Sequence, residues 1–514
     1  MATTIPTTPI PAPAHGRPHA RPQPKLGLRA WMESVLVECE RAAAGFEADP
    51  VHDLRVAIRR CRSLADGLMA IDPDPSWKEM KKAGKKVFQS LGGLRDMQVM
   101  QQWIEKLTEK LNGADDPVAI ALLAHVRVRE VECKQEALKE LQQFDRKQWR
   151  QWSRSLPHRA ARLRPGSVVF RHLALEKWTA AYELHKRALR TRSQTSFHEL
   201  RIGIKRLRYT VENFLPREHA AWGPDLKDLQ DFLGEVHDLD VLWNTAVQIA
   251  AFPDADSRTR WRQMLTEERS KRLARYREKM VGRESLWRVW RTALPSGPAL
   301  RSAAMIRLRT WGSYLDPDFS HSQRVARLAL ALYDGLMQAG LINQNGDHDS
   351  RAVLHAAALL HDVGKAKGNR EHHKDSFRMI RNLAQPLGWT AREMQLAAVI
   401  ARYHRGALPR ANKKSVQQVA LPDRSVTLQL AGVLRLANSL DMGNGHGQNS
   451  QPRLRVALDD KVIRVQSAGY ASLDRSAEEI AAARHLLEVV LRRPVLISRL
   501  PETPTRSSKL VARS

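Results

Sequence analysis

A helical segment near the start of the chain occurs twice, and this repeat restricts the fold more than any other feature of the sequence. Residues 52–62 match residues 198–208 at six of eleven positions. A second matched segment follows each copy, at residues 91–99 and 233–241. Two matched segments at nearly equal spacing predict a duplicated helical unit of roughly 140 residues.

Each repeated helix is predicted to carry a basic stripe and, on its opposite side, an apolar stripe. At about 100° per residue, the basic side chains of each copy fall within an arc of less than about 90°. A solvated charged face is the ordinary alternative, but such faces usually mix charges of both signs. The basic positions are His52, Arg55, Arg59 and Arg62, then His198, Arg201, Lys205 and Arg208; the apolar positions are Leu54, Ile58, Cys61 and Leu64, then Leu200, Ile204, Leu207 and Val211.

Such a row of basic side chains, spaced by one helical turn, suits a linear chain of phosphates. Arginine offers paired donors to phosphate oxygens, and lysine offers a point charge. Lys82 and Lys85 belong to a further cluster of one sign at residues 81–86. The whole chain has 84 Lys and Arg against 55 Asp and Glu, for a net charge of +29. This excess predicts a polyanionic partner: nucleic acid, a phosphate polymer or an anionic membrane.

The sequence ranks these three polyanions. No apolar run approaches the roughly 18 residues of a membrane helix, and no basic amphipathic segment exposes an apolar face, so no membrane partner is expected. Nucleic acid ranks second, because the chain has no zinc finger, RNA-recognition motif or aromatic stacking platform. The N-terminus has no secretory signal pattern, and the three cysteines form no metal motif. A cytoplasmic location is therefore expected.

A second chemical signal lies in the C-terminal part, where histidines and aspartates occur on successive predicted helices. The ordered set is His321, then the adjacent pair His361 and Asp362, then His373, His404 and Asp441. Imidazole and carboxylate ligands together suit Zn, Mn, Fe or Mg, with positions left for water and phosphate. Adjacent residues cannot share a face in mid-helix, but at a helix end broken by Gly364 both can reach one metal. A single His-Asp pair would be uninformative; the ordered set is much more specific.

Breaks in the pattern predict the organisation of the chain. A proline-rich stretch opens it, Pro165 with Gly166 divides the helical repeats, and a Pro-Ser-Gly-Pro cluster at residues 295–298 ends them. Residues 454–458 and 462–465 predict a β-hairpin, and residues 477–491 a helix. The predicted parts are a disordered leader 1–24, a basic helical domain 25–294 with repeats 25–160 and 166–294, a linker 295–314, a second domain 315–500 and a disordered tail 501–514.

The first domain resembles the CHAD domain, the conserved-histidine α-helical domain. The resemblance rests on the two His-(Asp/Glu)-Leu-Arg helices, on Arg208 and Tyr209 with Glu212 downstream, and on the two Leu-Gly…Asp segments. It implies two four-helix halves around a basic channel that binds inorganic polyphosphate. The eight basic stripe residues would line that channel. The family is regarded as a binding module and not as an enzyme.

The second domain resembles the HD phosphohydrolase superfamily, and more narrowly the C-terminal region of the exopolyphosphatase / guanosine pentaphosphatase family. The matching strings begin at His321, Ala356, His373, Arg402 and Leu434. The resemblance implies an all-α domain with a small C-terminal β-hairpin. His321, His361, Asp362 and Asp441 would bind a divalent metal. His373 and His404 would extend the site to a second metal or contact phosphate, as Lys365 would.

One departure from that family is plain: its actin-like ATPase-fold domain, which carries polyphosphatase activity, is replaced here by the CHAD-like region. The sequence therefore predicts a mainly α, polyphosphate-binding protein with a metal-dependent phosphohydrolase domain. Asp362 and Lys365 would act in catalysis on polyphosphate or phosphorylated nucleotides. A non-catalytic scaffold of polyphosphate granules, with a silent HD domain, is the alternative. The metal and the oligomeric state, including a homodimer, stay open.

Overall fold

The computed structural model describes residues 27–46, 48–110, 116–342, 349–442, 454–468, 470 and 475–500. The predicted leader 1–24 and tail 501–514 lie outside these described residues. Within them the chain is mainly α-helical, with one small sheet near its C-terminal end, as the sequence predicted. None of the described helices combines the length and the apolar character needed to cross a membrane.

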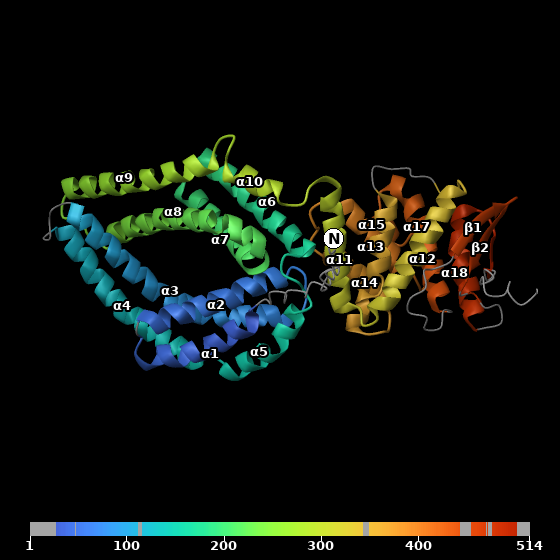
Figure 1. Cartoon of the computed structure of the whole chain (residues 1–514), viewed down its shortest axis with the longest axis horizontal. Coiled ribbons are helices and arrows are strands. Elements are labelled where there is room, and N and C mark those ends of the chain that lie inside the picture. The colour runs from blue at the N-terminus through green and yellow to red at the C-terminus, as the bar shows by residue number, and fades with distance from the viewer. Residues whose placement is uncertain are drawn as a thin grey trace, which may run out of the picture.

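The two repeats fold into matching helical halves (Figure 1). In each half four helices pack in chain order, each against the next, and a shorter fifth helix follows. This agrees with the four-helix halves that the resemblance implied. The first half consists of α1 (Leu28–Gly45), α2 (Ala48–Leu68), α3 (Pro75–Lys110), α4 (Pro117–Gln143) and α5 (Arg146–Ala160), and the second of α6 (Val168–Thr191), α7 (Gln194–Phe214), α8 (Pro216–Gln248), α9 (Ala255–Met280) and α10 (Leu286–Thr292).

The repeated helices α2 and α7 contact each other and bury their apolar stripes, which confirms the predicted orientation. All eight predicted apolar positions are buried, and seven of them have no exposed surface. The chain can bring α2 and α7 close because Gly67 has no side chain: the ring of Phe214 occupies the space beside it. Phe214 in turn stacks on Phe170, with ring centroids 4.3 Å apart.

The far ends of the two long helical hairpins, α3–α4 and α8–α9, share a smaller apolar core of their own. Trp103 of α3 and Trp261 of α9 are buried there. Lys110 Nζ, at the end of α3, lies 2.6 Å from the carboxylate of Glu268 on α9. The two halves are therefore joined at both ends, through α2 and α7 and through the hairpin tips (Figure 1).

The helices of the C-terminal part pack around a core of their own, and the small sheet lies at one side (Figure 1). Its helices are α11 (Gly297–Leu315), α12 (Phe319–Gln338), α13 (Ser350–Leu360), the 3-10 helix η1 (Val363–Lys367), α14 (His372–Asn382), α15 (Ala391–Arg402), α16 (Lys414–Gln417), α17 (Leu421–Met442) and α18 (Arg475–Leu491). The strands are β1 (Leu454–Asp459), β2 (Val462–Ser467) and β3 (Val495–Arg499).

The sheet contains the predicted hairpin and one strand that the sequence did not predict. β1 and β2 pair antiparallel, with Val456 opposite Val465. Residues 495–500 are a short apolar segment in the sequence, and here β3 pairs parallel to β2, with Ile463 opposite Val495. Parallel pairing requires a crossover connection, and α18 provides it.

The segment predicted as a linker, residues 295–314, is largely occupied by helix α11, which touches both parts of the chain. Arg307 is buried, forms an ion pair with Glu176 of α6 and donates a hydrogen bond to the Ala70 carbonyl at 3.2 Å. On the other side α11 packs against α13 and η1. Buried apolar side chains up to Leu294 belong to the two cores of the first part, and those from Ala304 onward belong to the core of the second part. We propose that the domain boundary lies in this segment.

The close contact between α2 and α7 can be tested at Gly67. A Cβ atom at this position would lie 2.2 Å from the Phe214 ring, which cannot move because it stacks on Phe170. We expect Gly67→Ala to lower the free energy of unfolding by about 1–3 kcal/mol, measured by urea denaturation. Gly234→Ala on α8 is the control: no atom lies within 4 Å of its added Cβ, so alanine should leave stability unchanged or raise it. Equal effects of both substitutions would contradict the contact.

Candidate metal centre and basic channel

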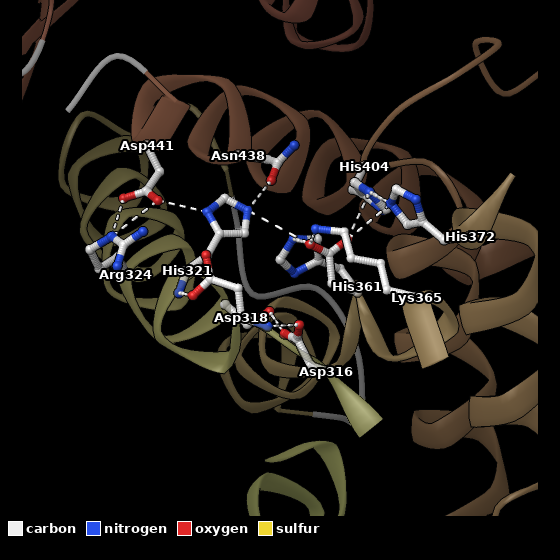
Figure 2. Close-up of polar contacts among 12 residues, drawn as sticks. Asp316, Asp318, His321, Arg324, His361, Lys365, His372, His404, Asn438 and Asp441 are labelled. Carbon is white, nitrogen blue, oxygen red and sulfur yellow. Dashed lines mark hydrogen bonds and ion pairs between the residues drawn. The ribbon is translucent and has the colours of Figure 1, made fainter. Parts of the chain in front are cut away.

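The candidate metal centre forms where the ends of five helical segments meet (Figure 2). His321 lies in the first turn of α12, whose N-terminus is capped by Asp318, with its carboxylate 3.1 Å from the His321 amide nitrogen. His361 and Asp362 lie between the end of α13 and η1. His372 begins α14, and His404 follows the end of α15. The sequence thus places polar side chains at helix ends, around an apolar core.

The bend between α13 and η1 lets the adjacent residues His361 and Asp362 face one centre, as predicted. His361 keeps helical backbone angles, while Asp362 has φ −106° and ψ 3°. Gly364 then passes so close to α14 that a Cβ would lie 2.1 Å from the His372 carbonyl oxygen. Only glycine fits there, because the obstructing atoms belong to the backbone. His361 and Asp362 are almost fully buried.

Three histidines are oriented in the same way by backbone carbonyls. The Nδ1–H groups of His361 and His404 donate to the carbonyls of Ala358 and Ala401, both at 2.8 Å, and that of His372 donates to Asn369 at 3.0 Å. A carbonyl oxygen can only accept, so Nδ1 carries the proton and Nε2 of the neutral ring has a free lone pair. All three Nε2 atoms lie near the carboxylate of Asp362.

Asp362 is the shared member of two groups of side chains that could each hold a metal ion. Its Oδ2 lies 3.5 Å from His361 Nε2 and 3.8 Å from His321 Nε2. Its Oδ1 lies 3.0 Å from His372 Nε2 and 3.6 Å from His404 Nε2. The groups are therefore His321, His361 and Asp362, and Asp362, His372 and His404.

The donor atoms of these groups fit a cation. His372 Nε2 and His404 Nε2 lie 3.2 Å apart, although both neutral rings present lone pairs there. Within the described part of the chain, the buried His361 Nε2 has no hydrogen-bond partner. An unpaired buried acceptor costs about 1–3 kcal/mol, which a coordinated metal would offset. The residues present thus suit a divalent metal, without identifying it.

The electrostatics favour neutral rings at His361 and His404 and an ionised carboxylate at Asp362. Burial lowers the pKa of His361, and it lowers the pKa of His404 well below its usual value. Burial alone would raise the pKa of Asp362, but the surrounding histidines and Lys365 lower it far more. Neutral imidazole and ionised carboxylate are the forms that coordinate metal. His321 differs: burial alone would lower its pKa, but the hydrogen bond to Asp441 and the charge of Asp362 raise it.

Not every predicted ligand enters these groups. Asp441 lies on the other side of His321, with its Oδ2 2.7 Å from His321 Nδ1, and it also pairs with Arg324. In this position Asp441 would orient the His321 ring rather than share its metal. His373 belongs to neither group; its neighbour His372 takes that place. Lys365 Nζ lies 2.5 Å from Asp362 Oδ2.

Sequence reasoning missed His372, Asn438 and Arg324. The pair His372–His373 does mark the segment, but which ring faces inward depends on where α14 begins. Glu371 has a left-handed backbone, with φ 57°, so the helix begins at His372 and turns that ring toward Asp362. Asn438 lies on α17, within the matching string that begins at Leu434. Its Oδ1 lies 3.0 Å from His321 Nε2.

A pocket of about 270 Å³ opens onto the centre. Members of both candidate metal groups line it together with Lys365, and residues of α17 and α18 complete its wall. Its lining residues are His321, Asp362, Lys365, His372, His404, Arg405, Arg435, Asn438, Ser439, Glu479, Ala482 and Ala483.

Basic side chains from the two stripes lie close together beside Tyr209, and we call the region that they share the basic channel. Burial, together with the positive charges of Arg201 on its own helix and Arg59, Arg55 and Arg62 on α2, lowers the pKa of Lys205 to about 8. Tyr209 receives cations from both helices, since Arg59 and Lys205 lie over its ring at 5.8 and 6.0 Å. In an ordinary solvated face, charged side chains are spread out. Here the cations of the two repeats lie close to one another.

Two buried arginine nitrogens in the channel, Nε of Arg59 and Nε of Arg62, have no hydrogen-bond partner among the residues that the structure describes. Such donors suit phosphate oxygens. Arg55 also donates to the Leu91 carbonyl. Arg208 lies 5.9 Å from the ring centre of Tyr209.

The remaining predicted channel residues differ in exposure. His52, Lys82 and Lys85 are exposed, at the outside of the first half. His198 is half-buried, with its Nδ1 3.3 Å from Nδ1 of His237. A cavity of about 290 Å³ contains Arg201 and Lys205.

The channel also holds acids that sequence reasoning did not single out as channel residues. Asp96 and Asp238 occupy equivalent places in the two repeats, and burial raises the pKa of each, that of Asp238 to about 6. The repeated Leu-Gly…Asp segment was the available signal for both. These carboxylates offset part of the positive charge that the stripes bring together.

The fold and the two sites define a protein in which a duplicated basic helical module precedes an all-α domain with a His/Asp centre. Family models agree with this division: residues 28–247 match the CHAD domain, and residues 306–473 match Ppx/GppA phosphatase, domain III. The chain therefore carries a CHAD domain followed by a Ppx/GppA phosphatase domain III region.

Curated relatives match only a segment of the chain. The bifunctional uridylyltransferase/uridylyl-removing enzyme of Cereibacter sphaeroides is 30% identical over 151 residues, which are 28% of this chain and 16% of that enzyme. The same enzyme of Azospirillum brasilense is 29% identical over 145 residues, 27% of this chain and 15% of that enzyme. The chain thus spans about one sixth of the length of these curated relatives.

Among solved structures, the crystal structure of the CHAD domain from the plant Ricinus communis is 22% identical to this chain. The match covers 56% of this chain and 98% of that chain, with a TM-score of 0.34.

The assignment of His372 rather than His373 to the centre gives a direct test. His372→Ala removes an Nε2 atom 3.0 Å from Asp362 and should strongly reduce bound divalent metal, measured by elemental analysis after incubation with Mn or Zn and removal of free metal. His373→Ala is the matched control, because its ring lies in neither group, and it should retain metal. Thermal melting of both variants checks folding. Metal loss in His373→Ala alone would overturn the assignment.

Proposed function

We propose that the protein binds inorganic polyphosphate through its CHAD domain and hydrolyses polyphosphate or phosphorylated nucleotides at a metal-dependent HD-type centre. The observation that carries the hydrolytic part is the convergence of three carbonyl-oriented histidines on one buried carboxylate, at the wall of a basic pocket. The ring nitrogens and the carboxylate suit a cation. The adjoining pocket has space for an anion.

The residues that would hold metal are the two groups that share Asp362, while Asp441 and Arg324 keep the His321 ring in place. Mn, Mg, Zn and Fe all suit such ligands. When bound, the metal supplies positive charge that lowers the pKa of a water molecule and neutralises charge on phosphate. Lys365 would bind a phosphate oxygen beside it, because its ammonium lies at the pocket wall.

The reaction itself is an exchange of one P–O bond for another. The water oxygen forms the new bond to phosphorus, and the bridging oxygen leaves with its bonding electron pair. The proton lost by water passes to the leaving oxygen or to solvent. Charge builds up on the leaving oxygen and on the transferred phosphoryl group, so cationic side chains placed before the reaction lower its barrier.

In the CHAD domain, the converging stripes would hold a phosphate chain by charge and by bidentate arginine contacts. The unpartnered Nε atoms of Arg59 and Arg62 supply donors for this purpose. The affinity of such contacts falls with added salt, because binding releases condensed counterions.

One observation favours a second candidate, a scaffold of polyphosphate granules with a silent HD centre. The ammonium of Lys365 lies 2.5 Å from Asp362 Oδ2, close enough to replace a metal ion at that oxygen. In a silent site this ion pair would persist in the presence of metal. In an active site Lys365 would release Asp362 and turn to the substrate.

Hydrolysis can be separated from binding by one substitution. With Mn, Mg, Zn or Fe added, the full-length protein should release phosphate from polyphosphate or from nucleotides. Asp362→Ala removes the carboxylate shared by both metal groups and should abolish this release while polyphosphate retention persists. Phosphate is measured colorimetrically and retention by filter binding. If no metal supports release from any of these substrates, the scaffold role stands and the hydrolytic role fails.

The channel can be tested through the titration of Lys205. Burial and neighbouring cations lower its pKa to about 8, so in the free protein the ammonium loses its proton as the pH rises through that value. We expect polyphosphate affinity to fall between pH 7 and pH 9. Lys205→Arg keeps the charge throughout this range and should flatten the profile. A profile that is unchanged in Lys205→Arg would exclude Lys205 from binding.

The same binding assay tests the choice of polyanion. Arg59→Gln with Arg62→Gln should weaken polyphosphate binding and reduce the steepness of its salt dependence, by about one in the logarithmic slope for each lost contact. Competition with duplex DNA at physiological salt is the control for nonspecific charge. Displacement of polyphosphate by an equal phosphate concentration of DNA would favour a nucleic-acid partner.

A further inference from the structure

Two arginines line the pocket of the metal centre and have no assigned role. Arg405 directly follows His404, and Arg435 lies one helical turn before Asn438 on α17. Arg435 donates to the backbone carbonyls of Tyr403 and Gly406, on either side of His404 and Arg405, so both arginines lie beside the candidate metal group that contains His404. We propose that Arg405 and Arg435 form a subsite for the phosphates next to the one being cleaved, so that the pocket selects inorganic phosphate chains over nucleotides. The inference rests on the proposed hydrolytic function.

The charge of the two guanidinium groups is not neutralised by an ion pair. Among the described residues, no carboxylate forms a salt bridge with either one: Arg435 donates to the carbonyls of Gly406 at 2.8 Å and Tyr403 at 3.5 Å. Carbonyl oxygens position a guanidinium without cancelling its charge. Burial and the nearby charge of Arg405 lower the pKa of Arg435, which places the two cations close to each other. Two uncompensated cations in one pocket favour an anion that carries several charges.

The loop that carries Arg405 is held rigidly against the metal centre. Gly406 has φ +75°, a left-handed conformation, and its carbonyl receives the hydrogen bond from Arg435. A Cβ on Gly406 would lie 2.9 Å from Nε2 of His373. His373 thus packs under the loop, which explains a histidine at this position outside both metal groups. The loop therefore joins Arg405, Arg435 and His404 in one fixed arrangement, as a preformed anion site requires.

The pocket offers a phosphate chain three cationic side chains, those of Lys365, Arg405 and Arg435. Lys365 lies on the side of Asp362, and the two arginines lie along the walls from α15 and α17. Glu479 of α18 is the acidic residue on the remaining wall. Its carboxylate repels phosphate, so it would direct the chain toward Arg405 and Arg435. A terminal phosphate at the metal groups would then place the following phosphates against the arginines.

The described lining of the pocket has few groups that could recognise the base or the sugar of a nucleotide. Proteins that bind bases stack them on aromatic side chains or on other flat apolar surfaces. The described lining of this pocket contains no phenylalanine, tyrosine or tryptophan, and its apolar members on α18 are Ala482 and Ala483. The chemistry of the walls therefore matches an inorganic chain of phosphates in preference to a nucleoside phosphate.

The test compares a chain with a single phosphate. Arg405→Gln with Arg435→Gln is assayed with long-chain polyphosphate, tripolyphosphate and p-nitrophenyl phosphate, in the full-length protein loaded with its best metal. A background with Arg59→Gln, Arg62→Gln and Lys205→Gln excludes effects of the CHAD channel. We expect kcat/KM to fall at least about ten-fold for both chains, mainly through KM, and to change less than about two-fold for the single phosphate ester. Arg410→Gln is the control: it removes one positive charge from an exposed arginine outside the pocket and should change neither.

Two results would overturn the subsite. An equal loss for chains and for p-nitrophenyl phosphate would show that the arginines only support the centre, and a nucleoside triphosphate cleaved in preference to tripolyphosphate would contradict the selectivity. Binding keeps the outcome separate from that of the proposed function. If no phosphate is released by the unsubstituted protein, hydrolysis fails, but calorimetry with tripolyphosphate still decides: the double variant should bind it at least about ten-fold more weakly, with orthophosphate binding little changed. Unchanged tripolyphosphate binding would reject the subsite.

Discussion

The apolar contact between α2 and α7 is the interaction on which the basic channel depends. Arginines and lysines of like charge repel one another, and burial makes this repulsion costlier. The apolar stripes behind them are fully buried and interlock where Gly67 admits the Phe214 ring. Hydrophobic burial thus stabilises an arrangement that electrostatics opposes. The lowered pKa of Lys205 and the raised pKa of Asp238 are the electrostatic signs of this opposition. An arriving polyanion would relieve it.

The candidate metal centre likewise holds a buried charge, but this charge is negative. Asp362 is a buried carboxylate whose ionised form is stabilised by rings and by Lys365 around it. The rings are held by carbonyl groups at helix ends, where backbone acceptors are free of intrahelical bonds. The centre therefore needs no flexible loop to assemble. In the structure the rings of His361, His372 and His404 are held by backbone hydrogen bonds near the ends of α13, α14 and α15. The channel brings together cationic side chains, which suit an anion. The centre brings together nitrogen and oxygen atoms with lone pairs, which suit a cation.

α11 connects these two sites physically. The helix packs against α6 of the CHAD domain and against η1, which directly follows Asp362. Arg307 and Tyr314 of α11 reach into the first domain through Glu176 and the Arg159 carbonyl. A segment that reads as a simple break between two helical regions is in this way a shared structural element. Its helical character follows from apolar positions on two faces, one toward each core.

Much of this architecture could be predicted from the sequence, because it depends on local periodicity and on repetition. The duplication, the buried face of each repeated helix, the hairpin at β1 and β2, and the bend at His361 and Asp362 all follow from patterns within a few turns of chain. The convergence of both basic stripes agrees with the resemblance to the CHAD domain. Each of these predictions required only that apolar side chains be removed from water.

Only the tertiary structure decided which side chains meet. Whether His372 or His373 faces Asp362 depends on a single left-handed residue, Glu371, and so on the point where α14 begins. The place of Asp441 behind His321 depends on the rotation of α17 against α12. β3 exists because α18 carries the chain back beside β2. Residue types and spacing indicate a candidate metal centre, from histidines and aspartates on successive helices, and a basic surface, from charges on one face of each repeated helix. Contacts between helices depend on how side chains pack over the whole core. A local sequence pattern does not contain this information.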